Sequence, residues 1–328
     1  MSSLDYAAIL VALMVAVFAP IPVRVILERA RILDVPNGRS SHRRPVLRGG
    51  GLAPMLALVA AVPLVIVAGD RALVVVAITV ATGAALLGFV DDVRSLPARA
   101  RLILQLILGA VCGLAVAQLT EAPMWWAALV MIGVAAYINM VNFMDGADFI
   151  SGLHGLVAGA SLAVAGALTD TAFLTVGGAL VAVVFAGFLP WNVLGARMFL
   201  GDVGSYLLGA ALSALAVAAI ASGVPPLAVL APFSVYVVDT SVTVVRRVLR
   251  KENLLEAHRS HIYQELLIAG WTHLRVAVTV AVFTALAACV GLLSVSALSP
   301  EIALTGVIAI NAAYVVVGMA AQRRVSQS

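Results

Sequence analysis

Residues 72–90 of the chain are ALVVVAITVATGAALLGFV, an unbroken apolar run without a charged side chain. A helix needs roughly 20 such residues to cross the hydrocarbon core of a bilayer. Similar runs recur along the whole chain, which is 63% hydrophobic and only 11% charged, with a mean hydropathy of +1.10. Soluble domains have about a quarter of their residues charged. The sequence therefore predicts an all-α protein that crosses a membrane many times.

The apolar runs give eleven predicted transmembrane helices, and no soluble domain, repeat or low-complexity linker separates them. We therefore expect a single transmembrane domain over residues 1–328. The first run lacks a small-residue cleavage site, so we interpret it as a retained helix and not a signal peptide. Cys112 and Cys289 lie in apolar runs and predict neither a disulfide nor a metal site. The predicted helices cover residues 4–27, 51–69, 72–90, 100–118, 124–141, 153–169, 172–190, 203–222, 226–246, 273–295 and 301–320.

Basic residues set the predicted orientation. Of the 20 Lys and Arg residues, only Arg71 falls in an even-numbered connection between helices. The other nineteen lie in odd-numbered connections, at helix ends that face them, or in the C-terminal tail. Cytoplasmic loops collect Lys and Arg because their translocation is opposed, so we expect the N-terminus outside and the C-terminus in the cytoplasm. The net charge of +4 is then a local basic face for anionic lipid or nucleotide, although topology alone accounts for most of these charges.

The first connection contains Arg48-Gly49-Gly50-Gly51, and the third contains Asp91-Asp92. Arginine presents a planar donor fork to phosphate oxygens, and glycines let backbone N–H groups approach an anion closely. A basic loop of this kind is also a common topology determinant. Adjacent carboxylates repel each other unless a cation holds them, and carboxylates near phosphates commonly bind Mg²⁺. Two solvated loop acids are the alternative for the aspartate pair.

The fifth connection combines two amides and two acids without a basic residue, namely Asn139, Asn142, Asp145 and Asp148. Uncompensated acids beside a membrane favour a bound cation or a hydrogen-bonding ligand. The seventh connection begins with a further amide, Asn192. Together these side chains indicate a polar ligand site at the end of the predicted bundle.

The span that follows starts with Gly201-Asp202-Val203-Gly204-Ser205, where a helix N-terminus could face an anion and Asp202 could bind a metal. Ordinary helix capping is the alternative. The ninth connection contains His258-Arg259-Ser260-His261, and we favour contacts to a diphosphate because a His-x-x-His pair with one acid is a poor zinc signature. A membrane-surface helix is the alternative there. Asp239 lies inside a predicted span, where a functional role, an arginine partner and a hydroxyl partner all stay open.

All five polar clusters lie in connections 1, 3, 5, 7 and 9, on the predicted cytoplasmic side, which indicates a single site built from every inner loop. A lipid-linked sugar transporter would gather its polar groups near the bilayer midplane instead. A non-catalytic scaffold of an envelope-assembly complex would keep the helices but would not need the intact acids. Both alternatives fit the sequence less well than an enzyme.

In this order and spacing, the clusters resemble the motifs of the polyprenyl-phosphate N-acetylhexosamine-1-phosphate transferases. That family includes the bacterial undecaprenyl-phosphate GlcNAc-1-phosphate transferases and the phospho-MurNAc-pentapeptide translocase. Two departures are Asp145-Gly-Ala-Asp148-Phe149, where the family has Asp-Gly-x-Asp-Gly, and a less dense histidine block. The histidine block is similar to that of the branch that primes O-antigen or capsule assembly. The matching motifs are Arg48–Gly51, Asp91-Asp92, Asn142–Asp148, Phe199–Ser205 and His258–His261.

The resemblance implies a catalytic domain that moves an N-acetyl-amino-sugar 1-phosphate from a UDP-sugar to polyprenyl (undecaprenyl) phosphate, with UMP as the other product. It implies a multi-pass protein of the bacterial inner membrane with its site facing the cytoplasm, partnered by membrane lipids but not by nucleic acid, and a homodimer stays open. Direct attack by the lipid phosphate is favoured over an aspartyl intermediate. Mg²⁺ is the implied ion, with Mn²⁺ as an alternative, held by Asp202, Asp92 and Asp91. The implied catalytic residues are Asp91, Asp92, Asp145, Asp148, His258 and His261, and the implied substrate-binding residues are Arg48, Asn139, Asn142, Asn192 and Arg259.

Overall fold

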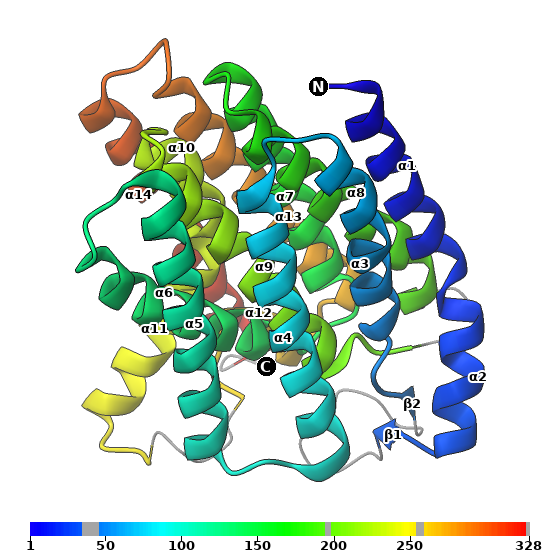
Figure 1. Cartoon of the computed structure of the whole chain (residues 1–328). Helices are drawn as coiled ribbons and strands as arrows, with labels where there is room; N and C mark the ends of the chain where they lie inside the picture. The colour runs from blue at the N-terminus through cyan, green and yellow to red at the C-terminus, as the bar shows by residue number, and fades with distance from the viewer. Residues whose placement is uncertain (35–45, 194–197, 254–258, 326–328) are drawn as a thin grey trace.

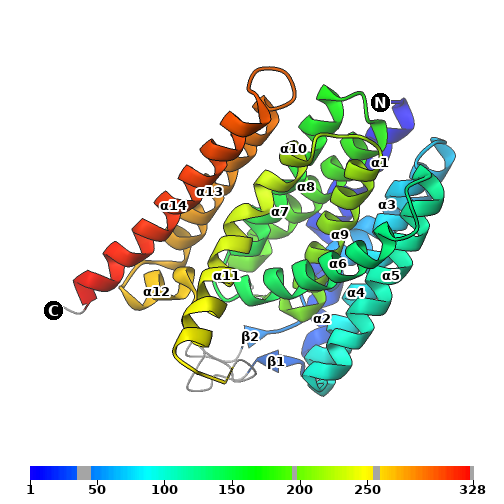
Figure 2. The same cartoon turned by 90° about the vertical axis from the view of Figure 1, so that its left-hand side faces the viewer.

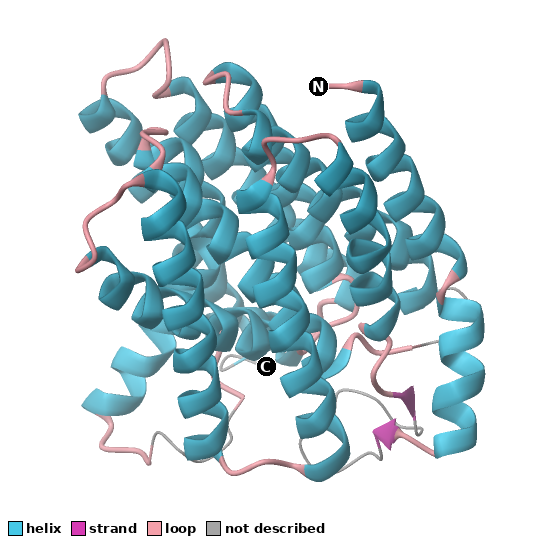
Figure 3. Ribbon diagram, viewed as in Figure 1, coloured by secondary structure: helices cyan, strands magenta, loops and turns pink. Residues whose placement is uncertain are grey.

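A computed structural model describes residues 1–34, 46–193, 198–253 and 259–325, and its helices run between two ends of the molecule (Figures 1 and 3). Within these residues, the strands β1 (Leu33–Asp34) and β2 (Val46–Leu47) form one short antiparallel pair. The all-α prediction is otherwise confirmed. The helices are α1 (Ser3–Phe18), α2 (Pro20–Ala30), α3 (Leu52–Val67), α4 (Ala72–Arg94), α5 (Ala98–Thr120), α6 (Trp126–Met144), α7 (Ile150–Leu168), α8 (Ala172–Val193), α9 (Gly201–Ala221), α10 (Pro226–Leu230), the 3₁₀ turn η1 (Ala231–Phe233), α11 (Ser234–Leu249), α12 (Ile262–Ile268), α13 (His273–Leu293) and α14 (Pro300–Val325).

Length and composition make nine helices of the described chain candidate membrane spans, or ten if α1 and α2 count as one span. The prediction of eleven spans differs at the N-terminal end for two physical reasons. The first predicted run is bent by 40° between α1 and α2, where Pro20 and Pro22 remove backbone donors. The second run forms α3, which has 16 residues and is therefore short for a span. The protein is thus a multi-pass membrane protein with a broken first helix.

The two termini of the described chain lie towards different ends of the bundle. Figures 1 and 2 show the N-terminus at one end and the C-terminus, the β1–β2 pair and α12 towards the other. Arg71, the one basic residue expected at the N-terminal end, forms an ion pair of 3.1 Å with the fully buried Asp5 of α1. Asp5 thus compensates the one exception to the charge pattern.

Helix α9 lies at the centre of the bundle, and 89% of its most apolar 18-residue stretch is buried. Glycines allow it to approach its neighbours closely. A Cβ atom on Gly88 of α4 would lie 2.3 Å from the carbonyl oxygen of Asp202, and one on Gly51 would lie 2.3 Å from the backbone of Gly204. These contacts hold the start of α9 against α4 and against the start of α3, and the contact with α4 places Asp202 beside the Asp91-Asp92 pair.

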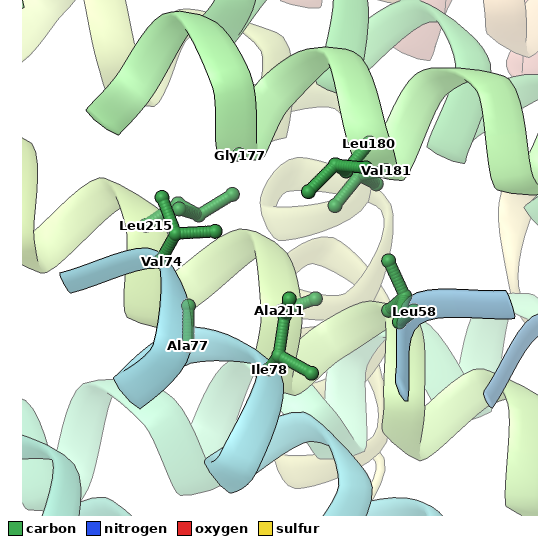
Figure 4. Close-up of a pocket in the computed structure, with 9 residues that line it drawn as sticks. All are labelled: Leu58, Val74, Ala77, Ile78, Gly177, Leu180, Val181, Ala211 and Leu215. Atoms are coloured by element: carbon green, nitrogen blue, oxygen red, sulfur yellow. The ribbon is translucent and has the colours of Figure 1, made fainter. Parts of the chain in front are cut away.

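A small cavity between α3, α4, α8 and α9 is entirely apolar (Figure 4). Without a polar side chain, it has nothing to recognise a nucleotide or a phosphate. None of the described polar residues singled out in the sequence is among the residues that line it. The cavity is lined by Leu58, Val74, Ala77, Ile78, Gly177, Leu180, Val181, Ala211 and Leu215.

Candidate active site

The first turn of α9 is capped by a carboxylate from another helix. Asp92, at the end of α4, accepts the backbone N–H of Asp202 at 3.0 Å and that of Val203 at 3.1 Å. The sequence predicts an anion at this helix start, because unpaired N–H groups and the helix dipole favour negative charge there. In the folded chain that anion is Asp92.

Arg48 joins the two aspartates. Its Nε lies 2.5 Å from Oδ1 of Asp92, and its Nη2 lies 3.0 Å from Oδ2 of Asp202. The Asp92 side chain is fully buried, whereas that of Arg48 is 32% exposed. An anionic ligand that approaches this cluster would therefore meet the guanidinium before the carboxylates.

Backbone pairing places Arg48 at this point. The N–H of Phe199 donates to the carbonyl of Leu47 at 2.8 Å, and the N–H groups of Gly50 and Gly51 donate to the carbonyls of Phe199 and Leu200 at 2.9 and 2.8 Å. The sequence predicts that these glycine N–H groups bind an anion. They instead join the first and seventh connections of the chain, which places Arg48 against Asp202.

Asp91 has a different set of partners from its neighbour. Arg101 of α5 binds its Oδ2 at 2.9 Å, the hydroxyl of Tyr206 donates to the same oxygen at 3.0 Å, and the N–H of Leu96 donates to Oδ1 at 2.8 Å. Each of the two adjacent aspartates therefore has its own arginine, which relieves the repulsion expected from the sequence. Sequence reasoning missed Arg101 and Tyr206, because neither lies in a polar motif.

The end of α6 brings Asn142 to Asp202. Its Nδ2 donates to Oδ1 of Asp202 at 2.8 Å and to Oγ of Ser205 at 3.1 Å.

Asp145 follows three residues after Asn142, and burial raises the pKa of its carboxyl to about 8. The charges of Asp202 and Asp92 raise this pKa further, whereas Ser151 and Arg48 oppose the shift. In the absence of a bound cation, Asp145 is therefore largely protonated at neutral pH and can donate a hydrogen bond.

The turn after Asp145 is held by two side chains from other segments. The N–H of Phe149 donates to Oδ1 of Asn192 at 2.6 Å, and Nδ2 of Asn192 donates to the carbonyl of Met198 at 3.2 Å. The N–H of Asp148 donates to Nδ1 of His273 at 3.1 Å. Since Nδ1 accepts this bond, its 3.5 Å approach to the Asp148 carboxylate is not a bond from a protonated Nδ1. His273 is a further residue that the sequence did not indicate.

Four predicted residues remain. Asn139 donates to Oε1 of Gln105 at 2.6 Å and to the carbonyl of Ala135 at 2.7 Å, so it joins α6 to α5 and is not brought to the Arg48 cluster. Arg259 is exposed at the surface. His258 lies outside the described residues. His261 lies near the end of α6, where its ring centroid is 6.1 Å from that of Phe143.

The model of glycosyl transferase family 4 matches residues 74–220 of the chain. The chain is 31% identical to a probable undecaprenyl-phosphate N-acetylglucosaminyl 1-phosphate transferase of Bacillus subtilis, over 79% of this chain and 75% of that protein. The chain belongs to the family of this transferase. Two other relatives are an undecaprenyl-phosphate alpha-N-acetylglucosaminyl 1-phosphate transferase of Thermotoga maritima, 30% identical over 73% and 75% of the two chains, and a decaprenyl-phosphate N-acetylglucosaminephosphotransferase of Mycobacterium tuberculosis, 29% identical over 80% and 75%. The resemblance seen in the motifs is confirmed.

The segment matched by family 4 contains the aspartate pair, Asn142 and Asp202, but it does not contain Arg48 or His261. Folding adds Arg48 to the family segment through the backbone pairing of Leu47 with Phe199. The site thus extends beyond the matched residues.

Part of the cluster has the chemistry of a divalent-metal site. Asp92 and Asp202 supply oxygen atoms, which Mg²⁺ prefers, and they already share one positive group, the Arg48 guanidinium. Within the described residues, no three His, Cys, Asp or Glu side chains stand close enough together to enclose an ion. The carboxylate oxygens of Asp92 and Asp202 are therefore of the type that binds a hard cation, and Arg48 lies between them.

Proposed function

We propose that this protein transfers an N-acetyl-amino-sugar 1-phosphate from a UDP-sugar to polyprenyl phosphate, which gives a polyprenyl-diphosphate sugar and UMP. The observation that carries the proposal is the cluster of Arg48, Asp92, Asn142 and Asp202, drawn from four separate segments at one end of the bundle. The relatives are named as transferases of N-acetylglucosamine phosphate to undecaprenyl or decaprenyl phosphate. The cluster suits phosphates, since acids, an amide and a guanidinium meet at one point.

In the proposed reaction, an oxygen of the lipid phosphate attacks the phosphorus that carries the sugar. The new P–O bond forms as the bond to the bridging oxygen breaks, and UMP leaves with that oxygen. Such a transfer depends mainly on positioning and on charge neutralisation. Arg48 supplies a partly exposed positive charge, Asn142 orients Asp202, and protonated Asp145 can donate to a phosphate oxygen. Asn192 and His273 hold the turn that carries Asp148.

We also propose that Asp202, with Asp92 and Asp91, holds Mg²⁺, or Mn²⁺ as an alternative. When bound, such an ion neutralises charge on phosphate oxygens. Arg48 lies between Asp92 and Asp202 and supplies positive charge there. Removal of divalent ions with a chelator should stop turnover, and addition of Mg²⁺ should restore it.

The proposal places the protein in the bacterial inner membrane, where it would act in the synthesis of a cell-envelope polysaccharide such as O-antigen or capsule. It counts α1–α2 and α3 as crossings, which gives eleven, and it places the N-terminus outside and the active site in the cytoplasm. The nineteen-to-one distribution of basic residues supports this orientation. The chain would form one catalytic domain, with a homodimer as a candidate assembly.

The decisive experiment identifies the released nucleotide. Purified protein is incubated with polyprenyl phosphate, Mg²⁺ and a panel of UDP-amino sugars, and the nucleotides are separated by chromatography. UMP in equal amount to the lipid product supports the proposal, and added UMP should regenerate the UDP-sugar, because one diphosphate is exchanged for another. Release of UDP in place of UMP would show attack at the sugar carbon and would refute the proposal.

A further inference from the structure

One buried carboxylate in the first half of α11 is not used by the proposed chemistry. Asp239 is fully buried and is bound through both of its oxygens. Oδ1 lies 3.0 Å from Nδ1 of His261 and accepts the N–H of Ile262 at 3.1 Å. Oδ2 accepts the N–H of Tyr263 at 3.1 Å and the hydroxyl of Tyr314 at 2.6 Å. The sequence left the partner of Asp239 open between an arginine and a hydroxyl, and it indicated neither the histidine nor the two amides.

Arginine is not the partner of Asp239 among the contacts of the described chain. Arg246 binds Glu265 at 3.2 Å, and Arg247 binds Glu252 at 3.0 Å. A carboxylate without a guanidinium depends on hydrogen-bond donors for its stabilisation. His261 is thus one of four donors that keep the buried charge stable.

The contact with Asp239 fixes the tautomer of His261. A carboxylate oxygen that already accepts an amide N–H acts as an acceptor, so Nδ1 of His261 carries the proton. Neutral imidazole with a proton on Nδ1 has its lone pair on Nε2. Asp239 therefore selects Nε2 as the nitrogen that can accept a proton or, once protonated, donate to a phosphate oxygen.

The same contacts place His261 beside the candidate active site. Its ring packs against Tyr263 and Phe143, with ring centroids 5.8 and 6.1 Å away. The hydroxyl of Tyr263 donates to the carbonyl of Phe143 at 3.0 Å, which fastens the start of α12 to the end of α6. Phe143 follows Asn142, whose amide binds Asp202. The Asp239–His261 pair is thus joined to the Arg48 cluster by the contact of His261 with Phe143 and by that of the neighbouring Asn142 with Asp202.

We propose that Asp239 is a positioning residue that holds the His261 ring, with its proton on Nδ1, so that Nε2 acts on the diphosphate of the nucleotide sugar. Asp239 itself touches no substrate and works through His261. This inference rests on the proposed function, since the diphosphate comes from that reaction. The competing explanation is purely structural, because Asp239 also accepts two backbone N–H groups at the start of α12.

A kinetic double-mutant cycle distinguishes the two explanations. The four proteins are the parent, Asp239→Asn, His261→Ala and the double variant, each assayed for UMP release with saturating lipid phosphate. Removal of a side chain that orients a functional histidine typically lowers activity about 10–100-fold. We expect a loss of this size in kcat for Asp239→Asn, whereas KM for the UDP-sugar should change less than about twofold. In the His261→Ala background, the same substitution should change kcat by less than about twofold, because the ring it positions is gone.

Tyr314→Phe is the matched control. It removes a donor to the other oxygen of the same carboxylate and leaves the contact with His261 intact. We expect it to lower kcat by less than about threefold, in line with the loss of one hydrogen bond away from the reacting groups. A loss in Tyr314→Phe as large as that in Asp239→Asn would assign Asp239 a structural role.

The remaining outcomes are also decisive. If Asp239→Asn lowers kcat by the same factor in the parent and in the His261→Ala background, Asp239 does not act through the histidine and the inference is wrong. A variant that no longer elutes as a single peak in detergent also overturns it, since the carboxylate would then be needed for folding. A parent protein that releases no UMP would refute the proposed function and this inference together, whereas an active parent with an additive cycle refutes the inference alone.

Discussion

Alanine in place of Gly88 is expected to disturb the site without removal of a polar group. The added Cβ would lie 2.3 Å from the carbonyl oxygen and 2.7 Å from the backbone nitrogen at the start of α9, where ordinary contacts are 3.4–4 Å. Relief of this overlap needs a shift of about 1.1 Å, and only backbone atoms are available to move. A misplacement of about 1 Å in an active site can cost about 10²-fold in rate.

The stability change should be smaller than the change in activity. Overpacking costs roughly 1–3 kcal/mol. Alanine recovers about 1 kcal/mol through its better helix propensity. We therefore expect Gly88→Ala to lose about 100-fold in kcat while the apparent Tm falls by only a few degrees.

Gly133 of α6 is the matched control, because a Cβ atom there meets nothing within 4 Å. Gly133→Ala should keep parental kcat and an equal or higher apparent Tm. The assay is UMP release together with thermal unfolding in detergent. Near-parental kcat in Gly88→Ala, at any stability, would show that the close approach of α4 and α9 does not set the geometry of the site.

Three further outcomes follow from the site and the topology. Asp202→Asn should abolish UMP release while the protein still elutes as a single peak, and near-parental turnover at ordinary Mg²⁺ would contradict its role as a metal ligand. Cysteine at Ser260 should react with a thiol reagent only when the reagent has access to the cytoplasm, whereas cysteine at Ser222 should react from outside; the reverse pattern would refute the orientation. Because burial raises the pKa of Asp145 to about 8, its ionisation opposes folding, so without Mg²⁺ the apparent Tm of the parent should fall between about pH 4 and 8. Asp145→Asn should lessen that fall, although Asp92, whose pKa burial raises to about 7, contributes over the same range. An unchanged pH profile would show that Asp145 does not contribute.

Features carried by local composition could be predicted from the sequence. The apolar runs indicated most of the helices, and the charge pattern indicated which connections lie together, because both depend on neighbouring residues along the chain. The break between α1 and α2 was missed, since an apolar run with Pro20 and Pro22 still has the composition of a span. Asp91 and Asp202 were indicated because acids next to apolar runs are uncommon.

The partners of those residues could not be predicted, because they come from distant helices. Tyr206 lies 115 residues from Asp91, and Tyr314 lies 75 residues from Asp239. Each tyrosine is followed by a run of apolar residues in its helix, and a buried tyrosine in such a helix is commonly a packing residue. Asn139 shows the opposite case, since it lies in a polar motif but binds Gln105 inside the helix bundle.

The two arginines at the aspartate pair have a consequence for the order in which ligands bind. When ionised, Asp91, Asp92 and Asp202 carry three negative charges, and Arg48 and Arg101 balance two of them, so these five side chains together are then net negative. Both proposed substrates are anions, and a net negative site repels them at close range. A cation should therefore enter before the nucleotide or with it. The apparent affinity for the UDP-sugar should then rise steadily with the concentration of the divalent ion, up to saturation.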